Sequence, residues 1–393
     1  MRHAPLSAEQ IDQLVQWRHA LHRAPELSGQ EKHTAQTVSD ALRATRPDRL
    51  MSGLGGHGVA AIYRGARDGP RVMIRCELDA LPILEREDVP YASMRDGIAH
   101  VCGHDGHMAI VLGVAQWVAA HRPRCGEIVL LFQPAEEDGS GARAVIADPR
   151  FAQIAPKYAF ALHNMPGLPL GAVALDAGPM ACPSRGLRAV FTGRAAHAST
   201  PHTGLSPAQA MAQVMQTLGQ FECGAAPQDS AFRRVTLTHA QLGAPTFGVA
   251  PAQGELWMTL RTQHDDAMQG LVQEVEAFLG DHARAYGLQV EITFEDVFAA
   301  CRNDEAATDI LQAAVTQCGA AQVSGALPMR ASEDFGEFGA VAQAAMLLLG
   351  AGEGHPALHD HYYDFPDALI PIGIDIFTRA VQAAGCECEG QLR

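Results

Sequence analysis

Five short stretches of the chain concentrate side chains that can bind metals or move protons. Each brings carboxylates, imidazoles or a thiol together within a few residues. Borderline divalent ions such as zinc or manganese accept all three ligand types, and a second such ion needs a ligand that bridges. The five stretches are residues 75–82 (RCELDALP), 100–108 (HVCGHDGHM), 131–137 (LFQPAEE), 161–164 (ALHN) and 355–361 (HPALHDH).

Each stretch also has an ordinary structural interpretation when it is taken alone. His163 could be a hydrogen-bonded residue at a strand end, Glu136 and Glu137 could form a solvated turn, and Cys102 could be a small buried hydrophobic residue. A nucleophilic Cys102 paired with a histidine is a competing chemical reading. It would leave the remaining histidines and glutamates without a role, so the joint occurrence favours a metal site.

Apolar runs separated by a helical pattern predict how these stretches are positioned. Residues 71–76, 127–132 and 158–163 look like buried strands, and residues 106–120 look like a helix between the first two. The pattern predicts an α/β domain with a mostly parallel central sheet. Three of the five stretches then follow strands, where open α/β sheets place their ligands.

The pattern changes between about residues 183 and 297. Two helices, residues 205–221 and 265–286, stand among strands expected at residues 188–192, 235–242, 255–262 and 289–294. We therefore expect a discontinuous catalytic domain formed by residues 1–182 and 297–393. Residues 183–296 would form an inserted α+β sandwich domain.

Composition narrows the classes of partner. The 393 residues carry 29 Lys and Arg against 44 Asp and Glu, a formal charge of −15, which argues against nucleic acid. No apolar stretch approaches the roughly 20 residues that span a bilayer, and the start of the chain lacks the apolar core of a secretory signal. Nine scattered cysteines form no CxxC pair. We expect no membrane partner and a reduced, cytoplasmic setting.

Several motifs, in this order along nearly the whole chain, resemble the metallo-aminoacylase and hippurate-hydrolase family. This family includes auxin-conjugate amidohydrolases and relatives of carboxypeptidase G. The motifs are CELDALP, HVCGHDGHMA, LLFQPAEE, ALHNMPGLPLG, GRAAHASTPHTGLSPAQA, ASEDFGEF and HPALHDHYYDFPDALIPIG. The resemblance implies a catalytic domain with two divalent ions, of manganese, zinc, nickel or cobalt, and an inserted lid domain that often forms dimers.

The resemblance also implies roles for individual residues. Glu136 would be the general base and acid, Asp79 would support the metal site from behind, and His197 would polarise the scissile carbonyl, commonly in a partner subunit. The implied metal ligands are Cys102, which would bridge, His104, Glu137, His163 and His359. Asp105 and His107 are expected to cap and orient the CGHDGH turn.

Two departures from the family pattern concern the substrate. Gly248 stands where relatives commonly carry the Asn of an Asn-Val-Ile-Pro stretch. Arg261 is retained and could hold a substrate carboxylate, although an Arg on a strand is commonly solvated or paired. His361 stands where a proline or small residue is expected, and is either a substrate contact or solvated.

The leading hypothesis is a metal-dependent amidohydrolase that acts on an N-acyl amino acid or a related amide, a small-molecule substrate. A second is a hydrolytic deaminase, amidase or esterase of the same family with an unusual aromatic substrate, suggested by Gly248. A catalytically inactive metal-binding protein would lack a ligand or the base, and both are present. A homo-oligomer through the inserted domain is the expected assembly.

Overall fold

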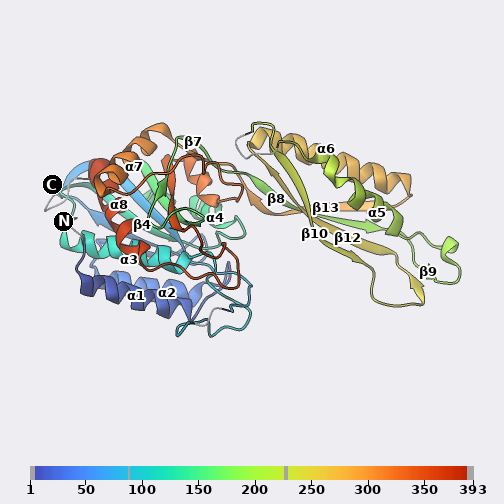
Figure 1. Ribbon diagram of the computed structural model, residues 1–393, viewed down its shortest axis with the longest axis horizontal. Coiled ribbons are helices and arrows are strands. Elements are labelled where there is room, and N and C mark those ends of the chain that lie inside the picture. Colours follow the sequence, from blue (N-terminus) through green and yellow to red (C-terminus); the bar gives the residue numbers. More distant parts are fainter. Residues whose placement is uncertain (1–4, 87–88, 225–228, 387–393) are drawn as a thin grey trace. The chain divides into compact units, whose positions relative to one another are not determined.

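The computed structural model describes residues 5–86, 89–224 and 229–386. It divides into two compact units (Figure 1). The first contains Met1–Met180, Cys301–Leu327 and Asp334–Arg393, and the second contains Ala181–Ala300 and Pro328–Glu333. The short return segment Pro328–Glu333 thus groups with the second unit, although the sequence pattern had placed it in the catalytic domain.

The first unit is built on a seven-stranded mixed sheet. The strand order is β1-β2-β4-β3-β5-β15-β6. The strands are β1 (Arg49–Leu54), β2 (Gly58–Arg64), β3 (Arg67–Glu77), β4 (Cys125–Gln133), β5 (Tyr158–Pro166), β6 (Val173–Ala174) and β15 (Gln343–Gly352). The helices are α1 (Ala8–His22), α2 (Lys32–Ala44), α3 (His104–Ala120), α4 (Gly141–Ala147), α7 (Glu305–Cys318) and α8 (Leu369–Ala383), with 3-10 helices η1 (Phe151–Gln153) and η4 (Asp334–Ala340).

The prediction of a mostly parallel sheet holds only for its centre. The pairs β4–β3, β3–β5 and β5–β15 are parallel, whereas β1–β2, β2–β4 and β6–β15 are antiparallel. The sequence pattern missed β1 and β2, which form a hairpin whose short connection contains Gly55 and Gly56, both at positive φ. Such a short connection can join only antiparallel strands.

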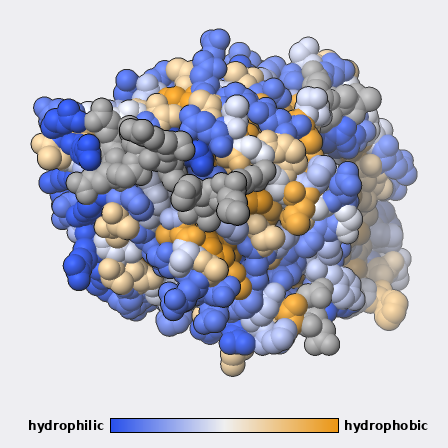
Figure 2. Space-filling view, turned by 60° about the vertical axis from the view of Figure 1, so that its left-hand side comes forward, coloured by the Kyte–Doolittle hydropathy of each residue, from blue (hydrophilic) through white to orange (hydrophobic). Residues whose placement is uncertain are grey.

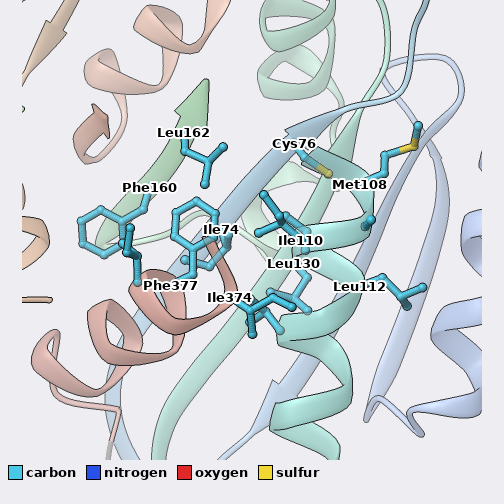
Figure 3. Packing of buried hydrophobic residues seen from close by; sticks show 14 of the residues in the cluster. Ile74, Cys76, Met108, Ile110, Leu112, Leu130, Phe160, Leu162, Ile374 and Phe377 are labelled. Atoms are coloured by element: carbon cyan, nitrogen blue, oxygen red, sulfur yellow. The ribbon is translucent and has the colours of Figure 1, made fainter. Parts of the chain in front are cut away.

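Helix α1 shows why the predicted elements form where they do. Ser7 accepts a hydrogen bond from the backbone of Gln10, whose side chain caps the Ser7 backbone in return, so the helix begins as expected from the sequence. Its Leu14 and Leu21 are buried in the same core as side chains of α2, α3, α7 and α8. Figure 3 shows this core, in which Ile110 of α3 and Ile374 of α8 lie against strand residues such as Ile74. Side chains of these helices and of the sheet therefore form one buried core.

The second unit is an antiparallel four-stranded sheet covered on one face by two helices, as Figure 1 shows. Its strand order is β10-β12-β8-β13. The elements are β8 (Ser184–Thr192), β10 (Arg233–Leu242), β12 (Gln253–Thr262), β13 (Gln289–Phe298), α5 (Ala208–Thr217) and α6 (Asp265–Ala285). Its smaller elements are β9 (Ala196–His197), β11 (Val249–Ala250), η2 (Pro201–Thr203) and η3 (Leu218–Phe221). The two-stranded pair of β7 (Gly178–Ala181) and β14 (Cys301–Asn303) belongs, except for Ala181, to the first unit. The four strands and two helices expected in the inserted region are present.

The surface of the protein is mainly hydrophilic on the face shown in Figure 2. Hydrophobic side chains gather there only in small groups. Within the described ranges no helix combines the length and apolar character needed to cross a bilayer. None of the eight cysteines among the described residues is in a disulfide, and Cys388 lies outside those residues.

Candidate metal centre

The five predicted ligands come together where the parallel strands of the first unit end. Cys102 and His104 stand at the start of α3, Glu137 follows β4, His163 lies on β5 and His359 follows β15. Because β3, β4, β5 and β15 run parallel, their carboxyl ends share one edge of the sheet. Residues far apart in sequence thereby reach one place.

The distances between their donor atoms suit metal coordination. Cys102 Sγ lies 3.4 Å from His163 Nε2. His104 Nε2 lies 3.8 Å from Glu137 Oε1, and His359 Nε2 lies 3.7 Å from Glu137 Oε2. Two ligands bound tetrahedrally to one zinc-like ion lie about 3.3–3.8 Å apart. The observed separations leave room for ions between these atoms.

The donor atoms form overlapping groups that share Cys102. Cys102, His104 and His163 offer one set of atoms within 4.8 Å of one another, and Cys102, Glu137 and His359 offer a second. A residue common to both sets stands where a bridging ligand between two ions would stand. The geometry therefore fits two ions as well as one.

Hydrogen bonds to the backbone aim the two buried imidazoles. His104 Nδ1 lies 2.9 Å from the Asp79 carbonyl, and His163 Nδ1 lies 2.7 Å from the Asn164 carbonyl. A carbonyl can only accept, so Nδ1 carries a hydrogen in both rings and Nε2 is the nitrogen that is left to bind a metal. His104 Nε2 is buried without a hydrogen-bond partner. An orphaned buried nitrogen of this kind fits a metal ligand.

The charges around the site call for a cation. Burial alone would lower the pKa of His104, but its hydrogen bond to Asp79 and the charges of Glu77 and Glu137 raise the pKa to about 10. Burial, with a contribution from the neighbouring His107, lowers the pKa of His163 to about 3 and keeps that ring neutral. The site therefore holds a positive charge close to its carboxylates, as a proton or as a metal ion.

The same surroundings argue against Cys102 as a free nucleophile. Burial and the charges of Glu137 and Glu136 raise the pKa of the Cys102 thiol well above its usual value. A nucleophilic cysteine needs a lowered pKa, and the position of Cys102 just before α3 does not offset the burial and the two carboxylates. Without a metal ion the thiol stays protonated, so the acyl-enzyme alternative loses its physical basis.

Asp79 lies directly behind the ligands. Its Oδ2 accepts hydrogen bonds from Ser28 Oγ at 2.7 Å and from the Glu137 backbone N–H at 2.9 Å. Its Oδ1 lies 3.5 Å from His104 Nδ1. Burial would raise the pKa of Asp79, but these contacts, above all with His104, lower it. One ionised carboxylate thus orients two of the candidate ligands.

A second buried network lies beneath the site, and sequence reasoning missed it. Arg75 pairs with Glu77 and with Asp334, the latter at 2.5 Å. Glu77 Oε2 lies 2.6 Å from His107 Nδ1, and Gln133 donates to Asp334. Arg75 within an apolar strand pattern was the available signal, because a buried guanidinium requires partners.

The expected capping role of Asp105 is wrong. The N-cap of α3 is Gly103, and no side chain caps that helix. Asp105 instead pairs with Arg18 at 3.1 Å and with His22 at 2.8 Å, both on α1. Because Asp105 is buried against α1, its charge stabilises the contact between two helices and does not cap the N-terminus of α3.

The expected substrate residues of the inserted region lie in the second unit. His197 is exposed on β9, opposite Val249 of β11, and Gly248 accepts a hydrogen bond from Ala198 N at 3.0 Å. A Cβ built on Gly248 meets nothing within 4 Å. His197 and Gly248 therefore share one small ribbon with space beside it.

Arg261 and His361 each donate a hydrogen bond to a backbone carbonyl, and Arg261 also donates to a serine hydroxyl. Arg261 Nη1 donates to the Arg330 carbonyl at 3.0 Å and to Ser332 Oγ at 2.8 Å, and burial lowers its pKa. His361 is exposed, and its Nδ1 donates to the Leu84 carbonyl at 2.7 Å. Of the two alternatives for His361, this exposed, backbone-bonded position favours the solvated one.

Comparison with known proteins shows the family to which the chain belongs. The model of peptidase family M20/M25/M40 matches residues 73–383. N-acetyl-L-cysteine deacetylase of Bacillus subtilis is 30% identical over 94% of this chain and 87% of its own. Hippurate hydrolase of Campylobacter jejuni is 28% identical over 90% and 91%. A solved Bacillus subtilis structure, described as a dinuclear metal-binding peptidase from family M20, is 26% identical with a TM-score of 0.78, covering 96% of this chain and 98% of that one.

The chain belongs to peptidase family M20/M25/M40. This membership confirms the resemblance inferred from the motifs, and with it the predicted class of enzyme, a hydrolase of carbon–nitrogen bonds.

Proposed function

We propose that this protein is a metal-dependent amidohydrolase that removes the acyl group from an N-acyl amino acid or a related amide conjugate. The observation that carries the proposal is the pair of ligand groups sharing Cys102, with Glu136 beside them. The deacetylase and hippurate-hydrolase names of the relatives support the same class of substrate.

Two divalent ions would be held by Cys102, His104, Glu137, His163 and His359, with Cys102 shared. Manganese, zinc, nickel and cobalt all accept this set of sulfur, nitrogen and oxygen donors. When bound, such ions lower the pKa of a water molecule and polarise an amide carbonyl. Asp79 would keep His104 and Glu137 in position through the contacts described above.

Glu136 is the proposed general base and acid. Its Oε2 lies 3.8 Å from His104 Nε2, and its side chain is nearly buried at the edge of the ligand set. From there the carboxylate can take a proton from the attacking water and deliver it to the nitrogen of the leaving amine. Glu137, the next residue, is left to bind metal.

His197 is the proposed donor to the oxyanion of the tetrahedral intermediate. The backbone N–H of Ser199 donates to His197 Nδ1 at 3.1 Å, and Ser199 Oγ lies 2.7 Å from the same nitrogen. A backbone N–H can only donate, so Nδ1 accepts and Nε2 carries the hydrogen. That Nε2–H is exposed and can stabilise developing negative charge. We propose that it acts in a homo-oligomer, from the inserted lid domain of a partner subunit.

The residues expected to bind the substrate carboxylate support a second candidate function. Gly248 supplies no amide to bind a substrate carboxylate, whereas Arg261 still supplies a cation. An amidase, esterase or deaminase acting on a substrate without that carboxylate would match the absence of the Asn. A panel of N-acyl amino acids against the corresponding carboxylate-free amides separates the two, because a preference for the free carboxylate favours the first.

A matched pair of glutamate variants tests the proposed mechanism. Glu136→Gln should keep metal and fold and lower kcat by about 100- to 10,000-fold on N-acetyl amino acids. Glu137→Gln should instead lose bound metal. Full turnover by Glu136→Gln would overturn the assignment of the base.

A further inference from the structure

The turn that carries Glu136 contains a backbone conformation that few residues adopt. Ala135 has φ of +50°, in the left-handed region. For a residue with a Cβ this conformation costs about 1–2 kcal/mol, and it persists only where the surroundings impose it. Ala135 immediately precedes Glu136, so its conformation decides the direction in which the Glu136 carboxylate leaves the end of β4, whereas the backbone of Glu137 is held separately by Asp79.

Two hydrogen bonds hold the peptide groups of Ala135. Glu31 Oε1 accepts from the Ala135 N–H at 2.8 Å, and Gly141 N donates to the Ala135 carbonyl at 2.9 Å. A Cβ at position 141 would lie 1.7 Å from the Pro134 carbonyl oxygen, so only glycine allows this approach. The left-handed residue is therefore fixed from both sides.

The Glu31 side chain bonds to the turn that contains Ala135 and does not cap the helix that it precedes. It occupies the N-cap of α2 but makes no side-chain capping bond there. Its side chain is fully buried, and Oε1 also accepts from Gly29 N at 2.8 Å. Glu31 belongs to none of the metal-capable groups found among the described residues. Its carboxylate therefore acts on the backbone of the turn.

We infer that Glu31 is a positioning residue that holds Ala135 in the left-handed conformation and thereby aims Glu136 at the reacting water. The inference rests on the proposed function of Glu136. It also accounts for a regular arrangement: Glu31 holds the N–H of Ala135, and Asp79 holds the N–H of Glu137. Two buried carboxylates thus clamp the residues on either side of the base.

Steady-state kinetics of Glu31 variants test the inference. Glu31→Leu removes the acceptor and should lower kcat by about 10- to 100-fold, the effect of leaving one buried N–H unpaired. KM should change less than about twofold and metal content should stay at the wild-type level, since Glu31 contacts no ligand atom. Glu31→Gln keeps an acceptor oxygen and is the matched control, expected within about threefold of wild type.

A second substitution tests the cause. Ala135→Gly lowers the cost of the left-handed conformation, so kcat of the double variant should be several-fold higher than the two single substitutions together predict. Strictly additive effects, or loss of metal from Glu31→Leu, would overturn the inference. If Glu31→Leu does not fold, Glu31→Asp, one methylene shorter, serves in the same cycle.

Glu136→Gln measured in the same assay separates the two claims. If Glu136→Gln is inactive and Glu31→Leu has wild-type kcat, only the role of Glu31 fails. If Glu136→Gln keeps wild-type turnover, the proposed function of Glu136 fails, and the inference that depends on it fails with it.

Discussion

Cys102 Sγ and His163 Nε2 lie 3.4 Å apart, although 61 residues separate them in the sequence. One residue precedes helix α3 and the other lies on strand β5, so the contact depends on the parallel sheet that brings both to its edge. Cys102 belongs to a second group as well, with Glu137 and His359. The thiol is therefore the atom on which both proposed ions depend.

Replacing this thiol should remove the metal ions from both proposed sites. We expect Cys102→Ser to retain much less than half of the wild-type metal after dialysis, because the hydroxyl is a far weaker ligand than a thiolate and serves both groups. Metal analysis of the purified protein measures this. The exposed Cys223 provides a matched control, and Cys223→Ser should keep its metal. Equal metal content in the two variants would contradict a bridging role.

Asp79 should control metal affinity more than folding. Asp79→Asn keeps the shape of the side chain and an oxygen that can accept from Ser28 and Glu137, but it removes the negative charge and places an NH2 group opposite His104 Nδ1. Loss of such a supporting contact typically weakens metal binding about 10- to 100-fold. Competition with a chelator measures the affinity. Ser28→Ala removes only one of the contacts and should have a smaller effect; the reverse order would count against this role.

Gly248→Asn should restore recognition of a substrate carboxylate. The position has open space for a Cβ, and its φ lies outside the left-handed region, so an Asn fits without strain. A new hydrogen bond to a charged group should raise kcat/KM for N-acyl amino acids about tenfold. The same variant should leave carboxylate-free amides unchanged. An equal gain on both substrates would show that residue 248 does not contact the carboxylate.

His22 should make stability depend on pH. Burial would lower its pKa, but contacts with Asp105 and Glu85 raise the pKa to about 9, above the value of 6.5 expected in the unfolded chain. Because its pKa is higher in the folded chain, protonated His22 stabilises the folded state, and this stabilisation is complete below about pH 6.5. The contribution to the free energy of unfolding, up to roughly 3 kcal/mol, is lost as the pH rises through about 9.

Thermal unfolding between pH 6 and pH 10 measures this contribution. The melting temperature of His22→Gln should fall less over that range than the melting temperature of wild type. His33→Gln, at an exposed position on α2, should behave like wild type. An unchanged slope in His22→Gln would show that the His22 pairs do not set the dependence.

Local patterns in the sequence determined much of this fold. Ser7 with Gln10 marked the start of α1, and the apolar runs at residues 71–76, 127–132 and 158–163 became β3, β4 and β5. These signals are local, since caps depend on neighbouring residues and buried parallel strands are apolar throughout. The hairpin of β1 and β2 was missed although its turn signal, Gly55-Gly56, is also local.

The residue types in the five polar stretches likewise determined the chemistry. Imidazoles, a thiol and carboxylates at strand ends predicted a metal site before any distance was known. Only the tertiary structure decided which nitrogen of His104 faces the site, and that Asp105 binds Arg18 and His22 instead of capping its helix.

Glu31 shows the same limit most clearly. In the sequence it is one acidic residue before a helix, and its partner Ala135 is 104 positions away. Its function depends on a backbone dihedral angle and on an N–H group, and neither leaves a trace in residue type. Sequence specifies which groups are present, whereas the packing of distant segments decides which groups are buried together and must satisfy one another.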